Sequence, residues 1–410
     1  MTSSSAVRTW FDNTAHAVGD NAALRPYAIL LSLAHSLTGV AWFAYRNVAL
    51  LLSDDNAVCW PLFPACYHLR PFVTPTAARA AVSAYIAAGF AGATLFAIRR
   101  SRAGLGTFLL ATAMGTFLYA LDFRLRFNET YMFGWVVLVF LFAPRKAAAI
   151  EALVAIFYFW AGTLKLDTEW VTGAALYAKP LLVPANLIPA SCVYVLILEM
   201  VFIWALFARR LHWRIATYLQ LLLFHTVSWG VVGYFYPLQM FALTAIYPLV
   251  WFRTPDQSLT LAGLLSGGYD RATRWSVGTI AGAFSAFQLV PHLFPGDTAI
   301  TGEGRLFSLH MFDAKIQCEG GAVVTTSRGE RFRVPLAYGA VRFRCDPIVI
   351  LANAQQLCSH LDERDTSLVS VNIDAKRTTD DRMQPLVHVN DFCHQTVTYS
   401  VWHHNAWIGN

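Results

Sequence analysis

The chain has 410 residues, of which 56% are hydrophobic and 14% are charged, and its mean hydropathy is +0.45. Globular domains are about 45–50% apolar, so this composition excludes an ordinary soluble protein and indicates a polytopic membrane protein. The net charge of +6 comes from short clusters between long apolar runs. This distribution is typical of loops between membrane-spanning helices, and we expect no nucleic-acid partner.

Residues 1–26 lack a short apolar core followed by a small-residue cleavage site, so we expect a cytoplasmic N-terminal segment and no signal peptide. Apolar stretches of about 20 residues then predict about nine membrane spans in an α-helical bundle covering residues 27–294. The predicted spans are residues 27–52, 78–98, 103–121, 130–144, 147–165, 189–208, 213–233, 236–252 and 272–294.

Basic residues mark one face of this bundle as cytoplasmic, because Lys and Arg are retained on that side. In the predicted topology this face receives Arg99, Arg100, Arg102, Arg145, Lys146, Arg209, Arg210, Arg214 and Arg253. The opposite face carries Arg124 and Arg126, which we expect to be held by acidic partners or by a ligand.

The composition becomes mixed and polar after Phe294. Short alternating runs at residues 322–326, 331–334 and 368–373 favour half-buried strands, and a helical stretch covers residues 347–361. Residues 295–410 are therefore predicted to form an extracytoplasmic α+β or mostly β domain of roughly 110 residues, large enough to have its own core.

The most informative stretch runs from Tyr158 to Trp170. It crosses Ala161 and Gly162, which are small enough to let a neighbouring helix or a ligand approach the backbone, and it then places Lys165 at the edge of an apolar run. A lone ammonium there is costly, so such a lysine either extends to the interface beside Trp170 or takes part in chemistry.

Two further titratable residues lie inside predicted spans. Glu199 is interpreted as the only acid deep in a span, and an intramembrane carboxylate is a functional candidate that can equally bond a neighbouring helix. His225 follows the apolar residues 221–224. A lone histidine on an apolar helix is either a packing residue or a functional one, and the sequence leaves both readings open.

The segment Ala-Gly-x-x-Lys-Leu-Asp-x-x-Trp, followed by Gly173, resembles the signature of the vitamin K-dependent gamma-glutamyl carboxylases and the related HTTM family of bacterial membrane proteins. The resemblance extends from the Cys59 loop to about Cys393. It implies that Lys165 is a catalytic base and that Glu199 and His225 belong to the same site. Trp160 and Trp170, which flank the lysine, are then expected to line the quinone site.

The turn from Asp122 to Tyr131 resembles the carboxylase segment that runs from an aspartate to Asn-His-Ser-Tyr. Asp122, Asn128 and Tyr131 fit this pattern, while Glu129 replaces the family's histidine. The resemblance places Asn128 and Glu129 with the catalytic residues and Asp122 and Tyr131 with the substrate-binding ones. An ionised glutamate would repel a developing oxyanion unless it were protonated or paired, and an interfacial salt-bridge cluster is the alternative reading.

His310 lies in a segment that resembles the entry to the carboxylase lumenal domain, where aromatic and histidine side chains help to bind substrate. Leu309 and Ala314 replace a tryptophan and a histidine of the family. The resemblance also implies a disulfide bond between Cys59 and Cys358, whereas the remaining cysteines cannot be paired from the sequence. The Cys and His spacings match no zinc pattern, so we expect no metal.

The resemblance implies an integral membrane enzyme that couples oxidation of reduced vitamin K (phylloquinol or menaquinol) to carboxylation of a peptide or small glutamyl substrate, with O2 and CO2 as co-substrates. Two alternatives stay open. One is a relative that uses the quinone or lipid cavity for other chemistry, and the other is a non-enzymatic transport, export or immunity-type binding role.

Overall fold

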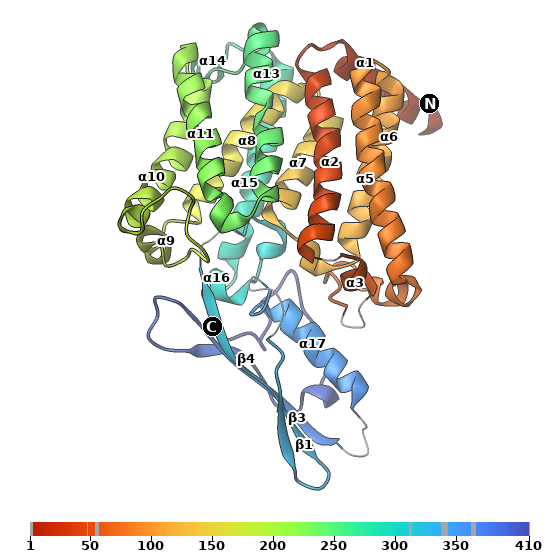
Figure 1. Ribbon diagram of the computed structural model, residues 1–410, viewed down its shortest axis with the longest axis vertical. Coiled ribbons are helices and arrows are strands. Elements are labelled where there is room, and N and C mark those ends of the chain that lie inside the picture. Colours follow the sequence, from red (N-terminus) through yellow and green to blue (C-terminus); the bar gives the residue numbers. More distant parts are fainter. Residues whose placement is uncertain are drawn as a thin grey trace.

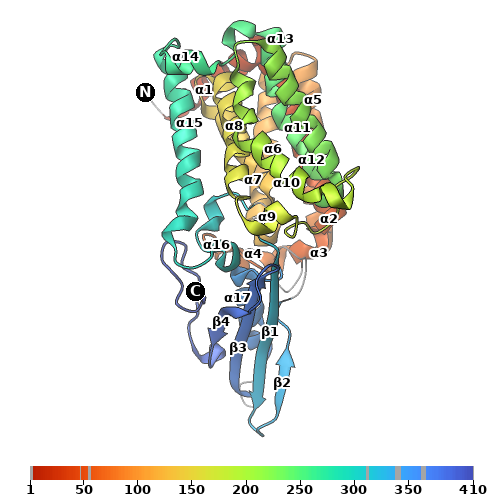
Figure 2. The ribbon, with the colours of Figure 1, turned by 90° about the vertical axis from the view of Figure 1, so that its left-hand side faces the viewer.

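A computed structural model describes residues 3–46, 48–53, 57–310, 314–337, 343–361 and 366–409. These residues form an elongated molecule in which a long helical bundle meets a small antiparallel sheet at one end (Figure 1, Figure 2). The N-terminal helix lies at the end of the bundle that is remote from the sheet.

The bundle contains most of the helices of the chain. They are α1 (Ser3–Asp20), α2 (Leu24–Arg46), α3 (Val48–Ser53), α4 (Cys66–Leu69), α5 (Pro75–Ala97), α6 (Ser101–Ala120), α7 (Asn128–Phe142), α8 (Lys146–Thr163), α9 (Thr168–Thr172), α10 (Ile188–Met200), the 3-10 helix η4 (Phe202–Phe207), α11 (Leu211–Val232), α12 (Phe235–Thr244), α13 (Ile246–Arg253), α14 (Leu261–Leu265) and α15 (Arg271–Leu289).

Helix α8 lies at the centre of the bundle, and nearly all of its residues are buried. It packs against α7, α10, α13 and α15, so a residue at its end is surrounded by other helices. Lys165, two residues after the end of α8, is therefore held inside protein, and this end of α8 lies on the side that faces the sheet (Figure 2).

Seven segments of the described chain are long and apolar enough to cross a membrane, which indicates a membrane protein. They are Leu24–Ala44, Pro75–Ala97, Ser101–Ala120, Lys146–Thr163, Ala185–Phe207, Leu211–Val232 and Phe235–Arg253. They coincide with seven of the predicted spans. The predicted spans 130–144 and 272–294 fall on α7, which is a shorter apolar helix, and on α15, which is not among the seven, so the number nine stays a prediction.

The C-terminal region contains a four-stranded antiparallel sheet in the order β2-β1-β3-β4. Its elements are α16 (Thr298–Thr301), β1 (Ile316–Thr326), β2 (Arg331–Val334), α17 (Pro347–His360), β3 (Thr366–Arg377) and β4 (Gln384–Val389). The three predicted strand runs lie within β1, β2 and β3, and the predicted helix coincides with α17, so these predictions are confirmed.

Alternation along β3 explains how this region forms a core of its own. Val369, Val371 and Ile373 are buried on one face of the sheet and belong to the same apolar cluster as Ile350 and Leu351 of α17. Because a strand presents every second residue to the same face, this pattern determines which face of β3 packs against α17.

A separate apolar cluster joins the bundle to the sheet region. Val58 and Phe123, from loops of the bundle, pack with Phe343 and with Ile348 and Val349 of α17. This junction is held by apolar packing and hydrogen bonds.

The disulfide predicted between Cys59 and Cys358 is wrong. Cys59 is bonded to Cys66, and Cys358 of α17 is bonded to Cys393. The loop after Cys59 turns back on itself through hydrogen bonds from Phe63 N–H to the carbonyl of Trp60 and from Cys66 N–H to the carbonyl of Phe63, which brings its two cysteines together locally. A third bond joins Cys318 to Cys345.

Candidate functional site

Lys165 and Glu199 form a buried ion pair just beyond the end of α8. The ammonium lies 2.5 Å from Oε2 of Glu199, and each side chain is only 1% exposed. Lys165 therefore does not extend to solvent, which excludes the reading of this residue as an interfacial anchor. A buried pair of this kind is costly to assemble, so its presence in a membrane-protein core points to a function.

Gly162 makes this pairing possible. A Cβ atom at this position would lie 2.7 Å from Cγ of Met200 and 3.2 Å from Cβ of Glu199. Only a residue without a side chain lets α10 approach α8 so closely. The prediction that this part of α8 admits a neighbouring helix is confirmed.

An apolar cavity of about 80 Å³ lies beside the ion pair, and we call it the Lys165 cavity. Lys165 is its only charged lining residue among those described; the others are mostly apolar side chains from α9, α10, α11, α12 and the loop after α9. The ammonium also lies 5.1 Å from the ring centroid of Trp170, within the range of a cation–π interaction. Trp170 and Lys165 thus share one cavity.

His225 lies in α11 next to residues that line this cavity, but it is not a lining residue itself. Its side chain is fully buried, and Nε2 lies 2.5 Å from the hydroxyl of Tyr158. Nδ1 has no hydrogen-bond partner among the described residues. Trp160 points elsewhere, because its indole N–H donates to Ser285 of α15.

The residues after Lys165 connect the cavity to the sheet. Asp167 caps α9 by accepting a hydrogen bond from Trp170 N–H, and the indole of Trp170 donates to the carbonyl of Cys192. Glu169 is 1% exposed and accepts backbone hydrogen bonds from Lys315, at the start of β1, and from Thr379, after β3. One short segment therefore contributes both to the cavity and to the junction of bundle and sheet.

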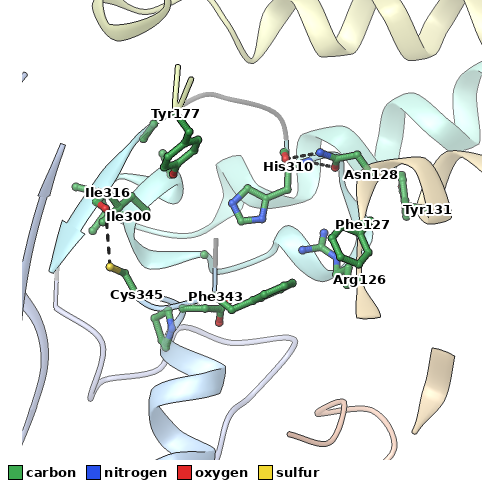
Figure 3. Close-up of a pocket in the computed structure, with 15 residues that line it drawn as sticks. Arg126, Phe127, Asn128, Tyr131, Tyr177, Ile300, His310, Ile316, Phe343 and Cys345 are labelled. Atoms are coloured by element: carbon green, nitrogen blue, oxygen red, sulfur yellow. Dashed lines mark hydrogen bonds between the residues drawn. The ribbon is translucent and has the colours of Figure 1, made fainter. Parts of the chain in front are cut away.

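A second cavity, of about 60 Å³, lies at this junction, and we call it the junction cavity. Asn128 clamps the backbone of His310 there: its side-chain amide donates to the carbonyl of His310 at 2.5 Å, and its oxygen accepts from His310 N–H at 2.9 Å. Figure 3 shows the imidazole of His310 and the guanidinium of Arg126 projecting into the same space. Tyr131 also lines this cavity, and its hydroxyl donates to the carbonyl of Phe307.

Asp346 introduces a titratable acid into the junction cavity. Burial raises the pKa of its carboxyl to about 6, although the N–H of Ile348 and the charge of Arg126 act in the opposite direction. The group therefore changes its charge in mildly acidic conditions. Arg126 is itself held by the backbone carbonyls of Arg305 and Ser308.

The two cavities adjoin along the loop after α9. Leu176 lines the Lys165 cavity, and the next residue, Tyr177, lines the junction cavity. The structure thus divides the predicted site: Lys165, Glu199 and Trp170 meet in one place, and Asn128, Tyr131 and His310 meet in another.

Two predicted residues of the Asp122–Tyr131 turn lie outside both cavities. Asp122 is fully buried and receives two hydrogen bonds from the Arg124 guanidinium, with Arg70 3.4 Å away. The expected acidic partner of Arg124 is therefore found. Glu129 lies with Gln239 at a small cavity between α2, α7 and α12.

Two residues of the bundle were missed or undervalued by sequence reasoning. Glu199 is not the only acid inside a span, since Glu151 lies in α8 and is fully buried, with Oε2 accepting from Leu259 N–H. Its position within the predicted span 147–165 was a sufficient signal. Cys192, the free cysteine among the described residues, lines the Lys165 cavity, which its sequence context does not reveal.

No family model, no curated protein and no solved structure matches this chain. The resemblance of the Lys165 segment to the carboxylases therefore stays a prediction.

Proposed function

We propose that the protein is an integral membrane enzyme of the vitamin K-dependent gamma-carboxylase type, in which Lys165 is the base that acts on a reduced naphthoquinone. The observation that carries this proposal is the buried Lys165–Glu199 pair beside an apolar cavity. An amine enclosed in this way can exchange a proton with a bound molecule without competition from water.

The lining of the Lys165 cavity fits a ring compound with an apolar tail. Val195, Val227 and Val231 supply aliphatic surface, and Trp170 and Tyr236 supply aromatic surface. When bound, a reduced naphthoquinone would supply an acidic ring hydroxyl and, through its oxidation by O2 to the epoxide, a base strong enough to remove the γ-proton of a glutamyl substrate, to which CO2 then adds. The amine of Lys165 would accept the hydroxyl proton.

Glu199 is proposed to set the protonation state of Lys165. Its carboxylate stabilises the ammonium, and it can take up the proton itself, which leaves a neutral amine and a neutral acid. Because both groups are buried together, one proton shared between them determines when Lys165 acts as a base. His225 and Tyr158 form the adjoining polar pair and are proposed to position α11 against α8.

The junction cavity is the proposed place for the glutamyl substrate. Arg126 offers a cation for a carboxylate, while His310 and Asn128 offer polar groups beside it. Ala314 lines the same cavity without a polar side chain, and Leu309 is buried with its N–H bonded to Gln288. These two replacements favour a substrate that differs from the carboxylase substrate.

A second candidate function follows from Cys192. A thiol that lines the same cavity as Lys165 suits a relative that uses the quinone or lipid cavity for other redox or acyl chemistry. A non-enzymatic binding role is the remaining alternative.

The topology proposed for this enzyme places the N-terminus in the cytoplasm and the sheet outside it. The opposite positions of α1 and the sheet along the bundle support this orientation, as does the clustering of basic residues in the loops predicted to be cytoplasmic. The three disulfide bonds, two of which lie wholly in the sheet region, also suit an oxidising compartment.

The test uses the purified chain in nanodiscs with reduced vitamin K, oxygen, labelled bicarbonate and a glutamyl peptide. We expect quinone epoxide and fixed label from the wild type and neither from Lys165→Met. The control is Lys179→Met, which removes an exposed lysine from the loop after α9. Epoxide without fixed label would favour the second candidate, and the absence of both products in the wild type would contradict an enzyme of this type.

A further inference from the structure

A third cavity, of about 340 Å³, lies between α2, α5, α6 and α7, and we call it the Trp42 cavity. It shares no lining residue with the Lys165 cavity, and its helices lie on the other side of the bundle from α9, α10 and α11 (Figure 1). Tyr131 lines both this cavity and the junction cavity, whereas the Lys165 cavity is separate from it.

Aromatic side chains dominate the lining of the Trp42 cavity. Trp42 and Tyr85 have stacked rings 5.6 Å apart, and Tyr119, Phe133 and Trp135 contribute further rings. Leu138, at its edge, is about half exposed on the apolar outer surface of the bundle. A cavity of this size and composition, next to the lipid side, suits a flat apolar molecule that enters from the membrane.

The described lining of the cavity carries no charged group. Its most polar member is His35, which is 3% exposed and lies between the hydroxyls of Tyr85, 3.0 Å from Nδ1, and Thr112, 3.2 Å from Nε2. Both ring nitrogens are thus partnered within the protein. A bound molecule would meet no counter-ion, which excludes charged head groups.

Two buried donors at this place have no acceptor among the described residues. They are the indole N–H of Trp42, a side chain that is only 2% exposed, and the side-chain amide nitrogen of Gln239, also 2% exposed. Gln239 lines a small adjoining cavity of about 20 Å³ together with Thr38, Trp42, Thr130 and the acidic Glu129, so of the two donors only Trp42 belongs to the uncharged lining of the Trp42 cavity. An unpaired buried N–H costs free energy, and a carbonyl oxygen on a ligand would satisfy it.

We propose that the Trp42 cavity binds an oxidised membrane quinone, with a ring carbonyl accepting the hydrogen bond of Trp42. An oxidised quinone is flat, neutral and apolar, and its oxygens accept hydrogen bonds without donating any, which matches the one unpartnered donor, the Trp42 indole, in an aromatic, uncharged lining. This site is separate from the Lys165 cavity and does not depend on the chemistry proposed there.

Gly134 of α7 provides a way to fill the cavity. It lines the cavity, and a Cβ atom added there meets no atom within 4 Å. Gly134→Phe therefore places a ring in the cavity without a clash at Cβ, and it replaces a poor helix former inside a helix. Gly282→Phe on α15 is the matched control, because Gly282 has equally open surroundings and lines none of the cavities described above.

The experiment is native mass spectrometry of the detergent-solubilised full chain titrated with menaquinone-4. We expect Gly134→Phe to bind one menaquinone-4 fewer than the wild type and Gly282→Phe to bind the same number. Trp42→Phe, which keeps an aromatic ring and loses the donor, should weaken that binding about fivefold, the effect of one hydrogen bond.

Two results would overturn the proposal. One is an equal number of bound quinones in the wild type and in Gly134→Phe. The other is loss of a co-purified phospholipid from Gly134→Phe with no change in its quinone binding, which would assign the cavity to an acyl ester. Neither result affects the epoxide assay that tests the role of Lys165. The failure of this proposal can therefore be distinguished from the failure of the proposed function.

Discussion

Replacing Glu199 by glutamine keeps the shape of the side chain and removes the negative charge that contacts the Lys165 ammonium. Both partners are 1% exposed and lie 2.5 Å apart, so the substitution leaves a cation buried without its counter-charge. Breaking a buried pair from one side costs about 3–5 kcal/mol. For a chain of 410 residues this corresponds to a fall in Tm of about 3–6 °C.

The assay is thermal unfolding of the purified chain in detergent, followed for the four members of a double-mutant cycle. Lys165→Met and Glu199→Gln should each lower Tm, whereas the double variant should recover to within about 1 kcal/mol of the wild type, because it buries no charge. Glu319→Gln, at an exposed position on β1, is the control and should change stability by less than about 0.5 kcal/mol. A Glu199→Gln variant with wild-type Tm, or a double variant with the summed losses of the two singles, would refute the reasoning.

Three further predictions concern the junction and the sheet. Burial raises the pKa of Asp346 from 3.8 to about 6, so the folded state binds the extra proton and stability falls as pH rises from about 4 to about 6. Asp346→Asn should remove this fall. The fall in the free energy of unfolding is at most roughly 3 kcal/mol, and solvent in the adjoining cavity reduces it. An unchanged slope of Tm against pH in Asp346→Asn would contradict the assignment. Glu169→Gln should speed hydrogen exchange of the Lys315 backbone amide, because an NH2 group replaces one of the two oxygens that accept backbone hydrogen bonds. The loss should lower the free energy of unfolding by about 1–3 kcal/mol. Exchange at the wild-type rate would argue against this contact. Peptide mapping without reduction should find Cys358 linked to Cys393, and a peptide linking Cys358 to Cys59 would restore the pairing expected from the resemblance.

The sequence was sufficient where local chemistry determines the structure. Gly162 and Lys165 at the end of one apolar run predicted a close helix approach and an amine at the edge of the bundle, and the helical stretch predicted over residues 347–361 coincides with α17. Each of these features depends on residues a few positions apart. The alternation in β3 likewise reveals its buried face without knowledge of its neighbours.

Features that depend on residues distant in the chain could not be predicted in the same way. The pairing of Cys59 is an exception, because its partner Cys66 lies only seven residues away and the resemblance implied the distant Cys358 instead. The division of the site into two cavities depends on contacts between distant segments, since Asn128 at the start of α7 binds the backbone of His310, 182 residues further along the chain. No periodicity along a single helix contains that information.

The most direct test of the central claim is an experimental density map of the chain in nanodiscs with vitamin K hydroquinone under anaerobic conditions. We expect ring density in the Lys165 cavity, with a ring oxygen within hydrogen-bonding distance of the Lys165 amine. The apolar tail of the hydroquinone should leave the cavity along α10. An empty Lys165 cavity in a map that resolves quinone elsewhere in the bundle would contradict this expectation.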